Sequence, residues 1–210
     1  MSSVLTLSSL PLFPLGTVLF PGGILPLRIF EVRYLDMIRK CHKAGAPFGV
    51  VSLNQGTEVR QPGGKEAFAS VGTLATIGEF ETPRPGLMMI RAIGAQRFRI
   101  TSSDQLRHGL WVADVECMDM DMTVAIPDDL QGTSVALARL IQSLRHKAIP
   151  PQQMPIQGPF QLDDCGWVAN RWCEFLPLPV QLKQRLMELD NPLVRLELVS
   201  DVLARTGIAG

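Results

Sequence analysis

The chain has 210 residues, which is enough to bury a sizeable core in one larger domain or two small ones. Hydrophobic residues make up 46% of it and charged residues 19%, a composition that excludes an intrinsically disordered chain. Twenty basic residues balance twenty acidic residues, so no net charge draws the chain to nucleic acid or anionic lipid. The four cysteines have no CxxC spacing, and we expect reduced, mostly buried thiols in a cytoplasmic protein.

Residues 10–27 carry no charge and approach the length of a membrane span. Four prolines and a Gly-Gly pair interrupt them, however, and would leave backbone groups unsatisfied in lipid. A signal peptide needs an early positive charge, but the first basic residue is Arg28. We therefore predict a soluble chain without a membrane anchor, whose opening forms bent, edge-type strands over residues 10–15, 17–20 and 24–29.

A helix is predicted directly after these strands, because apolar residues recur there at helical spacing. The expected buried face consists of Phe30, Tyr34, Met37, Ile38 and Cys41. Basic residues crowd the last turn, as the helix dipole favours, and Gly45 followed by Pro47 ends the helix.

Four further strands are predicted over residues 48–53, 71–80, 87–100 and 110–118. Polar residues 54–70 read as a long surface loop with a turn at residues 62–64, and the segment TSSDQLRHG separates the last two strands. The long third strand should bend near Gly94. Strands at this spacing favour a small closed or half-closed β-barrel.

The second half of the chain reads as helical. One helix carries Leu137, Leu140, Ile141 and Leu144 and ends near Lys147, and a proline-rich linker follows at residues 149–159. Three more helices follow the linker, with Asp163 and Asp164 as candidate caps and Asn191-Pro192 opening the last helix. We therefore predict an α+β protein, with a β-barrel subdomain and one helix at residues 1–122 and a helical bundle at residues 123–210.

No motif for catalysis or cofactor binding is present. The chain lacks GxxxxGK[ST], GxGxxG, HExxH and GxSxG, and its three histidines lie far apart. The acidic pairs at residues 128–129 and 163–164 stand at helix starts, where capping explains them. We predict no catalytic residue, no metal and no cofactor, and the protein is not expected to be an enzyme.

Binding to a polypeptide partner leaves weaker traces. We take Arg33, Tyr34, Arg84 and Met88 as candidate contact residues, although a salt bridge to a nearby acid is the favoured role for Arg33. The methionines at 88, 89, 118, 120 and 122 are pliable groups suited to varied contacts, but core filling explains them as well.

RNA binding is the alternative function. It would require Arg91, Arg97 and Arg99 to form a basic stripe on one face, interleaved with Phe98. The neutral net charge and the single tyrosine argue against nucleic acid as a partner. An unrecognised enzyme with a pocket in the barrel ranks third.

Three segments now point to a family. LPLFPLGTVLFPGGILPLRIFEVRY, VGTLATI and GLMMIRAIGAQRFRI follow one another as in the N-terminal domain of Lon proteases, and the IFEVRY form resembles stand-alone bacterial proteins that carry this domain. The tail also resembles the closing segment of that family, matching at Asp190, Arg195, Leu196, Glu197 and Val199, with valine in a leucine place. The resemblance covers roughly residues 10–206.

This resemblance implies a PUA-like β-barrel followed by a helical bundle, and a role in capturing polypeptide substrates. A similar domain occurs in cereblon, a substrate receptor of ubiquitin ligases. The ATPase and protease modules of Lon would follow this domain, so the resemblance implies neither ATP hydrolysis nor proteolysis for these 210 residues. The segment at residues 61–68 departs from the compact family pattern.

Overall fold

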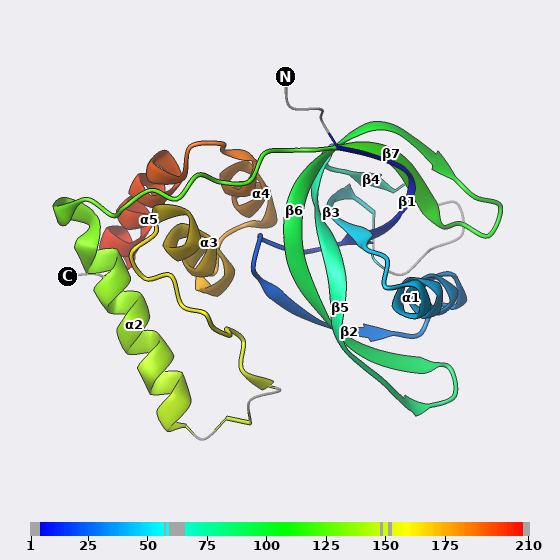
Figure 1. Cartoon of the computed structure of the whole chain (residues 1–210), viewed down its shortest axis with the longest axis horizontal. Coiled ribbons are helices and arrows are strands. Elements are labelled where there is room, and N and C mark those ends of the chain that lie inside the picture. Colours follow the sequence, from blue (N-terminus) through cyan, green and yellow to red (C-terminus); the bar gives the residue numbers. More distant parts are fainter. Residues whose placement is uncertain (1–4, 57, 59–65, 148, 151–152, 208–210) are drawn as a thin grey trace. The chain divides into compact units, whose positions relative to one another are not determined.

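The structure is a computed structural model that describes residues 5–56, 58, 66–147, 149–150 and 153–207. The chain divides into two compact units, Met1–Met120 and Asp121–Gly210, and each is described by itself. The first unit holds a seven-stranded sheet and one helix, and the second holds four α-helices (Figure 1). The predicted α+β class is therefore confirmed for the described residues.

The sheet is mostly antiparallel. Its strands are β1 (Thr6–Leu15), β2 (Ile24–Ile29), β3 (Phe48–Gln55), β4 (Ala67–Phe68), β5 (Val71–Arg84), β6 (Leu87–Gln105) and β7 (Trp111–Cys117). They pair in the order β1-β7-β6-β5-β3-β4, and β2 pairs with β6 beside this path. Because β1 also pairs with β3 in parallel, the path of pairings returns to its first strand.

The opening segment forms two strands where three were predicted. Residues 17–20 are not a strand, although Val18, Leu19 and Phe20 are buried. Hydrogen bonds of two kinds hold this stretch. The Thr73 hydroxyl of β5 donates to the Leu19 carbonyl (2.6 Å), and the Gly23 N–H donates to the Phe20 carbonyl (2.9 Å) within a local turn. Residues 17–20 are therefore apolar because they form a buried connection between two strands, and not because they pair as a strand.

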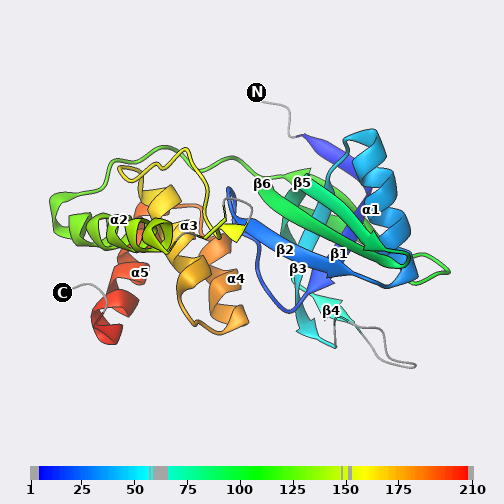
Figure 2. The same cartoon turned by 90° about the horizontal axis from the view of Figure 1, so that it is seen from below.

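Helix α1 (Val32–Ala44) lies beside the strands (Figures 1 and 2) and is anchored by the apolar face predicted for it, except at its start. Tyr34, Met37, Ile38 and Cys41 are buried in the core of the unit. Phe30 precedes the helix and is 57% exposed, so its predicted place on the buried face is wrong. Gly45 ends the helix in the left-handed region, at φ 62°, as predicted.

Strand β6 is the longest strand and the centre of the pairing scheme. The predicted irregularity at Gly94 is confirmed by a register shift between the pairs Ala75–Gly94 and Thr73–Arg97. A side chain at position 94 would collide with the Phe20 carbonyl oxygen, at 2.2 Å from an ideal Cβ, so glycine is required there.

Two segments predicted as loops contain strand residues. Residues 101–105 belong to β6 because they pair with β7 in an exposed hairpin, although their polar side chains gave no strand signal. The predicted loop at residues 54–70 contains the end of β3 and the short strand β4. Its predicted turn at residues 62–64 lies outside the described residues.

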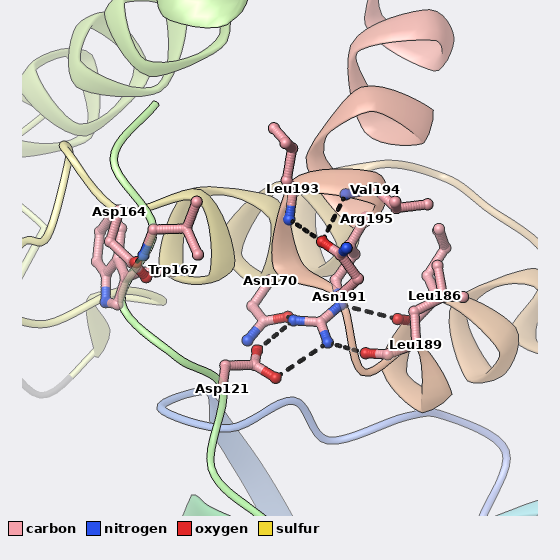
Figure 3. Close-up of polar contacts among 11 residues, drawn as sticks. Asp121, Asp164, Trp167, Asn170, Leu186, Leu189, Asn191, Leu193, Val194 and Arg195 are labelled. Atoms are coloured by element: carbon pink, nitrogen blue, oxygen red, sulfur yellow. Dashed lines mark hydrogen bonds and ion pairs between the residues drawn. The ribbon is translucent and has the colours of Figure 1, made fainter. Parts of the chain in front are cut away.

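The second unit contains helices α2 (Gln131–His146), α3 (Cys165–Phe175), α4 (Val180–Glu188) and α5 (Pro192–Thr206), with a short 3-10 turn at Asp128–Leu130. Helix α3 packs against each of the other three helices. Two predicted caps are confirmed: Asp164 accepts from the Trp167 N–H, and Asn191 accepts from the N–H groups of Leu193 and Val194 (Figure 3). The capping role predicted for Asp128 and Asp129 is wrong, because both lie inside the 3-10 turn and, among the described residues, neither that turn nor α2 has a side-chain cap. Asp163 precedes the cap of α3 and is not the cap itself. In the described part of the chain, no helix combines the length and the apolarity that crossing a membrane requires.

A buried arginine joins these helices. Arg195 of α5 is 1% exposed and forms an ion pair with Asp121, while its remaining donors reach the Asn170 side chain (3.1 Å) and the carbonyls of Leu186 (2.9 Å) and Leu189 (Figure 3). The guanidinium thereby ties α5 to α3, to the end of α4 and to the chain entering the unit. This arginine is one of the residues that match the family tail, so its position there has a structural reason.

Replacing Arg195 by methionine should destabilise the helical unit strongly, because it removes the hydrogen bonds that the guanidinium donates to the Asp121 carboxylate and to the carbonyls of Leu186 and Leu189. We expect the free energy of unfolding to fall by about 3–5 kcal/mol. Chemical denaturation followed by circular dichroism measures this loss. Arg205→Met, at the exposed end of the same helix, is the matched control and should change stability by no more than about 0.5 kcal/mol. Equal effects of the two substitutions would contradict the role of Arg195.

A second ion pair, between a buried arginine and a partly buried glutamate, makes the stability of this unit depend on pH. Arg171 and Glu174 form an ion pair in α3 at 2.8 Å. Burial raises the pKa of Glu174 to about 7, against the opposing effects of Arg171 and Lys183, and burial lowers the pKa of Arg171. Both groups therefore lose more through desolvation than their mutual attraction returns.

We expect the folded state to lose stability as Glu174 ionises. An unfolded glutamate titrates near pH ~4.3, so this contribution is fully present below that pH and is lost as the pH rises through about 7. The resulting fall in the free energy of unfolding is on the order of 1–3 kcal/mol between pH ~5 and ~8. Glu174→Gln should flatten this dependence in urea titrations, whereas Glu197→Gln on an exposed part of α5 should not. An unchanged dependence in the Glu174 variant would contradict the assignment.

Candidate functional site

The first unit contains an apolar groove beside β2. The groove has a volume of about 390 Å³. Its lining comes from the end of β1, from β2, from the two residues between β2 and α1, from the first turn of α1, and from two loop residues, Thr17 and Glu58. The lining residues are Phe13, Leu15, Thr17, Leu25, Pro26, Leu27, Arg28, Ile29, Phe30, Glu31, Tyr34 and Glu58. We call this the β2 groove. It lies where the core of the unit reaches the surface, because Leu25 and Leu27 also pack against the buried cluster.

Local sequence explains how the lining is placed. Residues 25, 27 and 29 of β2 alternate with 26 and 28, so the leucines and Ile29 share one face and Arg28 points to the other. Phe30 leaves the strand as an exposed aromatic ring at one margin of the groove. The floor is aromatic, since the rings of Phe13 and Tyr34 stack with their centroids 4.1 Å apart.

The polar groups around the groove are already engaged with neighbours. Arg33 donates to Glu31 (3.1 Å), to Glu66 (3.3 Å) and to the Gly109 carbonyl (2.7 Å), and its guanidinium lies 4.5 Å from the centre of the Tyr34 ring. Glu58 accepts from the Gly16 N–H at 2.6 Å.

Several carboxylates surround Tyr34 at the floor of the groove. Burial raises the pKa of Tyr34 above its ordinary value, and the carboxylates of Glu66, Glu31 and Glu58 add to this against the opposing charge of Arg33. The Tyr34 hydroxyl is therefore held neutral and is not poised for proton transfer.

The four predicted contact residues lie in different surroundings. Arg33 and Tyr34 are buried, and the favoured role of Arg33 as an ion-pair partner is confirmed. Tyr34 nevertheless lines the β2 groove. Met88 is buried in the core, and Arg84 is exposed at the β5–β6 hairpin. A binding role for these residues stays a prediction, but only Tyr34 lies at the groove.

Leu25, Leu27 and the exposed Phe30 are groove residues that the sequence pattern does not single out. Their apolar character was visible, but it predicts a buried strand and helix face equally well. Only the pairing of β1 and β2 with distant strands exposes them together.

The three arginines on which RNA binding would depend differ in their exposure to solvent. Arg91 is buried and paired with Glu79 at 3.3 Å, Arg97 is buried, and Arg99 is exposed. These positions do not form the exposed basic stripe that the alternative requires, and RNA binding itself stays a prediction.

The His, Cys, Asp and Glu side chains bear on metal binding and on nucleophilic chemistry. No group of three or more His, Cys, Asp or Glu side chains is placed to hold a metal ion within the part of the chain that the structure describes. The four cysteines are free and buried as predicted, and burial raises the pKa of the Cys173 thiol to about 12. Such thiols are poor nucleophiles at neutral pH.

A second groove of about 400 Å³ lies in the helical unit. Its walls come from α2 and from the end of α3: Ala136, Arg139, Leu140, Trp172, Phe175, Leu176 and Pro177. It is also apolar, but its described lining includes no strand edge.

Comparison with known proteins identifies the family. The family model described as the ATP-dependent protease La (LON) substrate-binding domain matches residues 9–205. The chain belongs to this family. The Lon N-terminal domain protein from Xanthomonas campestris is 31% identical with a TM-score of 0.72, and the match covers 93% of this chain and 98% of that one. The N-terminal domain of a Mycobacterium avium complex Lon protease shares the fold, at 16% identity and a TM-score of 0.56, over 92% of this chain and 96% of that one.

Longer proteins contain similar segments. The chain is 23% identical to the Lon protease of Anaeromyxobacter dehalogenans over 197 residues, which is 93% of this chain and 23% of that protein. It is 32% identical to cereblon of Danio rerio over 110 residues, or 49% of this chain and 24% of that protein. The chain thus spans about a quarter of the length of the curated relatives that it matches. The resemblance read from the opening motif is confirmed.

Proposed function

We propose that this chain is a non-enzymatic module that binds unfolded or extended polypeptide in the β2 groove. The observation that carries the proposal is an apolar groove at the surface of a member of the LON substrate-binding family. Exposed apolar surface bordered by polar groups is typical of protein interaction sites.

The energetics favour apolar side chains as occupants. Phe30 leaves most of its ring in solvent, and Leu25 and Leu27 are only partly buried. Covering such a side chain removes apolar surface from water and stabilises the complex by about 1.5–3 kcal/mol for a full burial. Unfolded chains present such side chains, whereas folded proteins have already buried most of theirs.

The proposal also includes a fold of two parts, a small β-barrel and a helical bundle. The return of the strand path to β1 supports a small β-barrel of the PUA-like type, and the packing of α3 against its three neighbours supports a helical bundle. Four buried, unpaired thiols suit a reducing compartment, so we place the protein in the cytoplasm.

The proposal predicts that a groove substitution weakens binding to an unfolded protein. Phe30→Ala should weaken the binding of β-casein by about tenfold, because it removes an apolar contact worth about 1.4 kcal/mol. Biolayer interferometry with immobilised β-casein in dilute salt measures the dissociation constant.

Leu5→Ala is the matched control for this experiment. Leu5 lies in the same unit and is also 57% exposed, but it does not line the groove, so its variant should bind like the parent. Absence of any casein binding by the parent chain would overturn the proposed function. Equal weakening by both substitutions would overturn the assignment of the groove.

A further inference from the structure

Strand β2 has one paired edge and one edge that the described strands leave open. All six of its residues pair with β6. The end of β1 also lines the groove. Strand β1 pairs with β7 as far as Pro11 and with β3 from Leu12 onward. Among the described strands, none pairs with the outer edge of β2 or with β1 residues 12–15 on the side away from β3. Both strands line the β2 groove, which therefore runs between two open edges.

The hydrogen-bonding phase of β2 can be assigned from its start. The Gly94 N–H donates to the Gly23 carbonyl at 2.9 Å, so this carbonyl points toward β6 and the N–H of Ile24, which follows it, points away. The direction of the backbone groups alternates in an antiparallel pair, so those of Leu25, Leu27 and Ile29 point to β6. The backbone groups of Ile24, Pro26 and Arg28 point to the outer edge of β2, and Pro26 and Arg28 line the groove. Pro26, which has no N–H, thus falls where it costs the sheet no hydrogen bond. The outer edge of β2 therefore offers the backbone N–H groups of Ile24 and Arg28 and the carbonyls of Ile24, Pro26 and Arg28.

The charges at the groove favour a basic occupant. Two carboxylates, Glu31 and Glu58, line it together with one cation, Arg28. Arg33 beside the groove adds one positive charge, but its second partner Glu66 adds one negative charge, so the excess of negative charge remains. A lysine or arginine on the bound segment would complement these carboxylates.

We propose that the β2 groove takes an extended polypeptide segment as an added strand, antiparallel to β2. This inference rests on the proposed function and specifies its mode. Backbone groups of the segment pair with Ile24 and Arg28 on either side of Pro26, alternate apolar side chains enter the groove between Leu25, Leu27 and Phe30, and a basic residue lies near Glu31 or Glu58. The antiparallel direction is chosen because such pairs are slightly more stable per residue than parallel ones.

Amide hydrogen exchange tests this mode directly. The probe is the strongest-binding 15-residue segment from a peptide array of β-casein, added to saturation and followed by NMR. The amides of Ile24 and Arg28 should exchange at least about tenfold more slowly in the complex, because they acquire hydrogen-bond partners. Those of Leu25 and Leu27, already directed to β6, are internal references. Binding without protection of Ile24 and Arg28 would overturn strand addition and leave the proposed function standing.

A backbone variant provides an independent test with a matched control. Arg28→Pro removes the outward N–H together with the side-chain charge, whereas Arg28→Ala removes only the side chain. We expect Arg28→Pro to bind the same segment at least about tenfold more weakly than Arg28→Ala. Equal affinities of the two folded variants would overturn strand addition. If no segment of β-casein binds the parent chain, both this inference and the proposed function fail.

Discussion

The change of partner along β1 is the constraint on which the β2 groove depends. Up to Pro11 the strand pairs with β7, and from Leu12 it pairs with β3. The buried connection through Leu19 and Phe20 then brings the chain to β6, where β2 pairs. Two strands that are close in sequence consequently remain unpaired with each other, with prolines at positions 14 and 26 limiting the donors on both. The apolar core is exposed in the groove between them.

The helical unit depends on a different kind of interaction. Arg195 is almost fully buried, and its donors satisfy a carboxylate, an amide and two carbonyls from separate parts of the unit. A buried charge of this kind gives less net stability than apolar packing, but removing one partner is costly. This explains why a charged residue stands within an apolar helix repeat: it specifies how the helix ends meet.

Local features of the fold could be predicted from the sequence, whereas the site could not. Capping by Asp164 and Asn191 and the stop at Gly45 depend on a few adjacent residues, so their chemistry is readable directly. The opening motif gave the family, because it is long and specific. The groove depends instead on strand pairings between distant residues. Burial at residues 17–20 and exposure of Phe30 follow from those pairings, and hydrophobic periodicity carries no information about them.

The central claim is that polypeptide docks at the β2 groove and not at the apolar groove of the helical unit. Photo-crosslinking tests it most directly, with a β-casein segment that carries a benzophenone group and mass spectrometry of the adducts. The account predicts adducts within residues 13–31, at Phe13, Leu27 or Phe30. Adducts confined to residues 136–177, around Trp172, would contradict it.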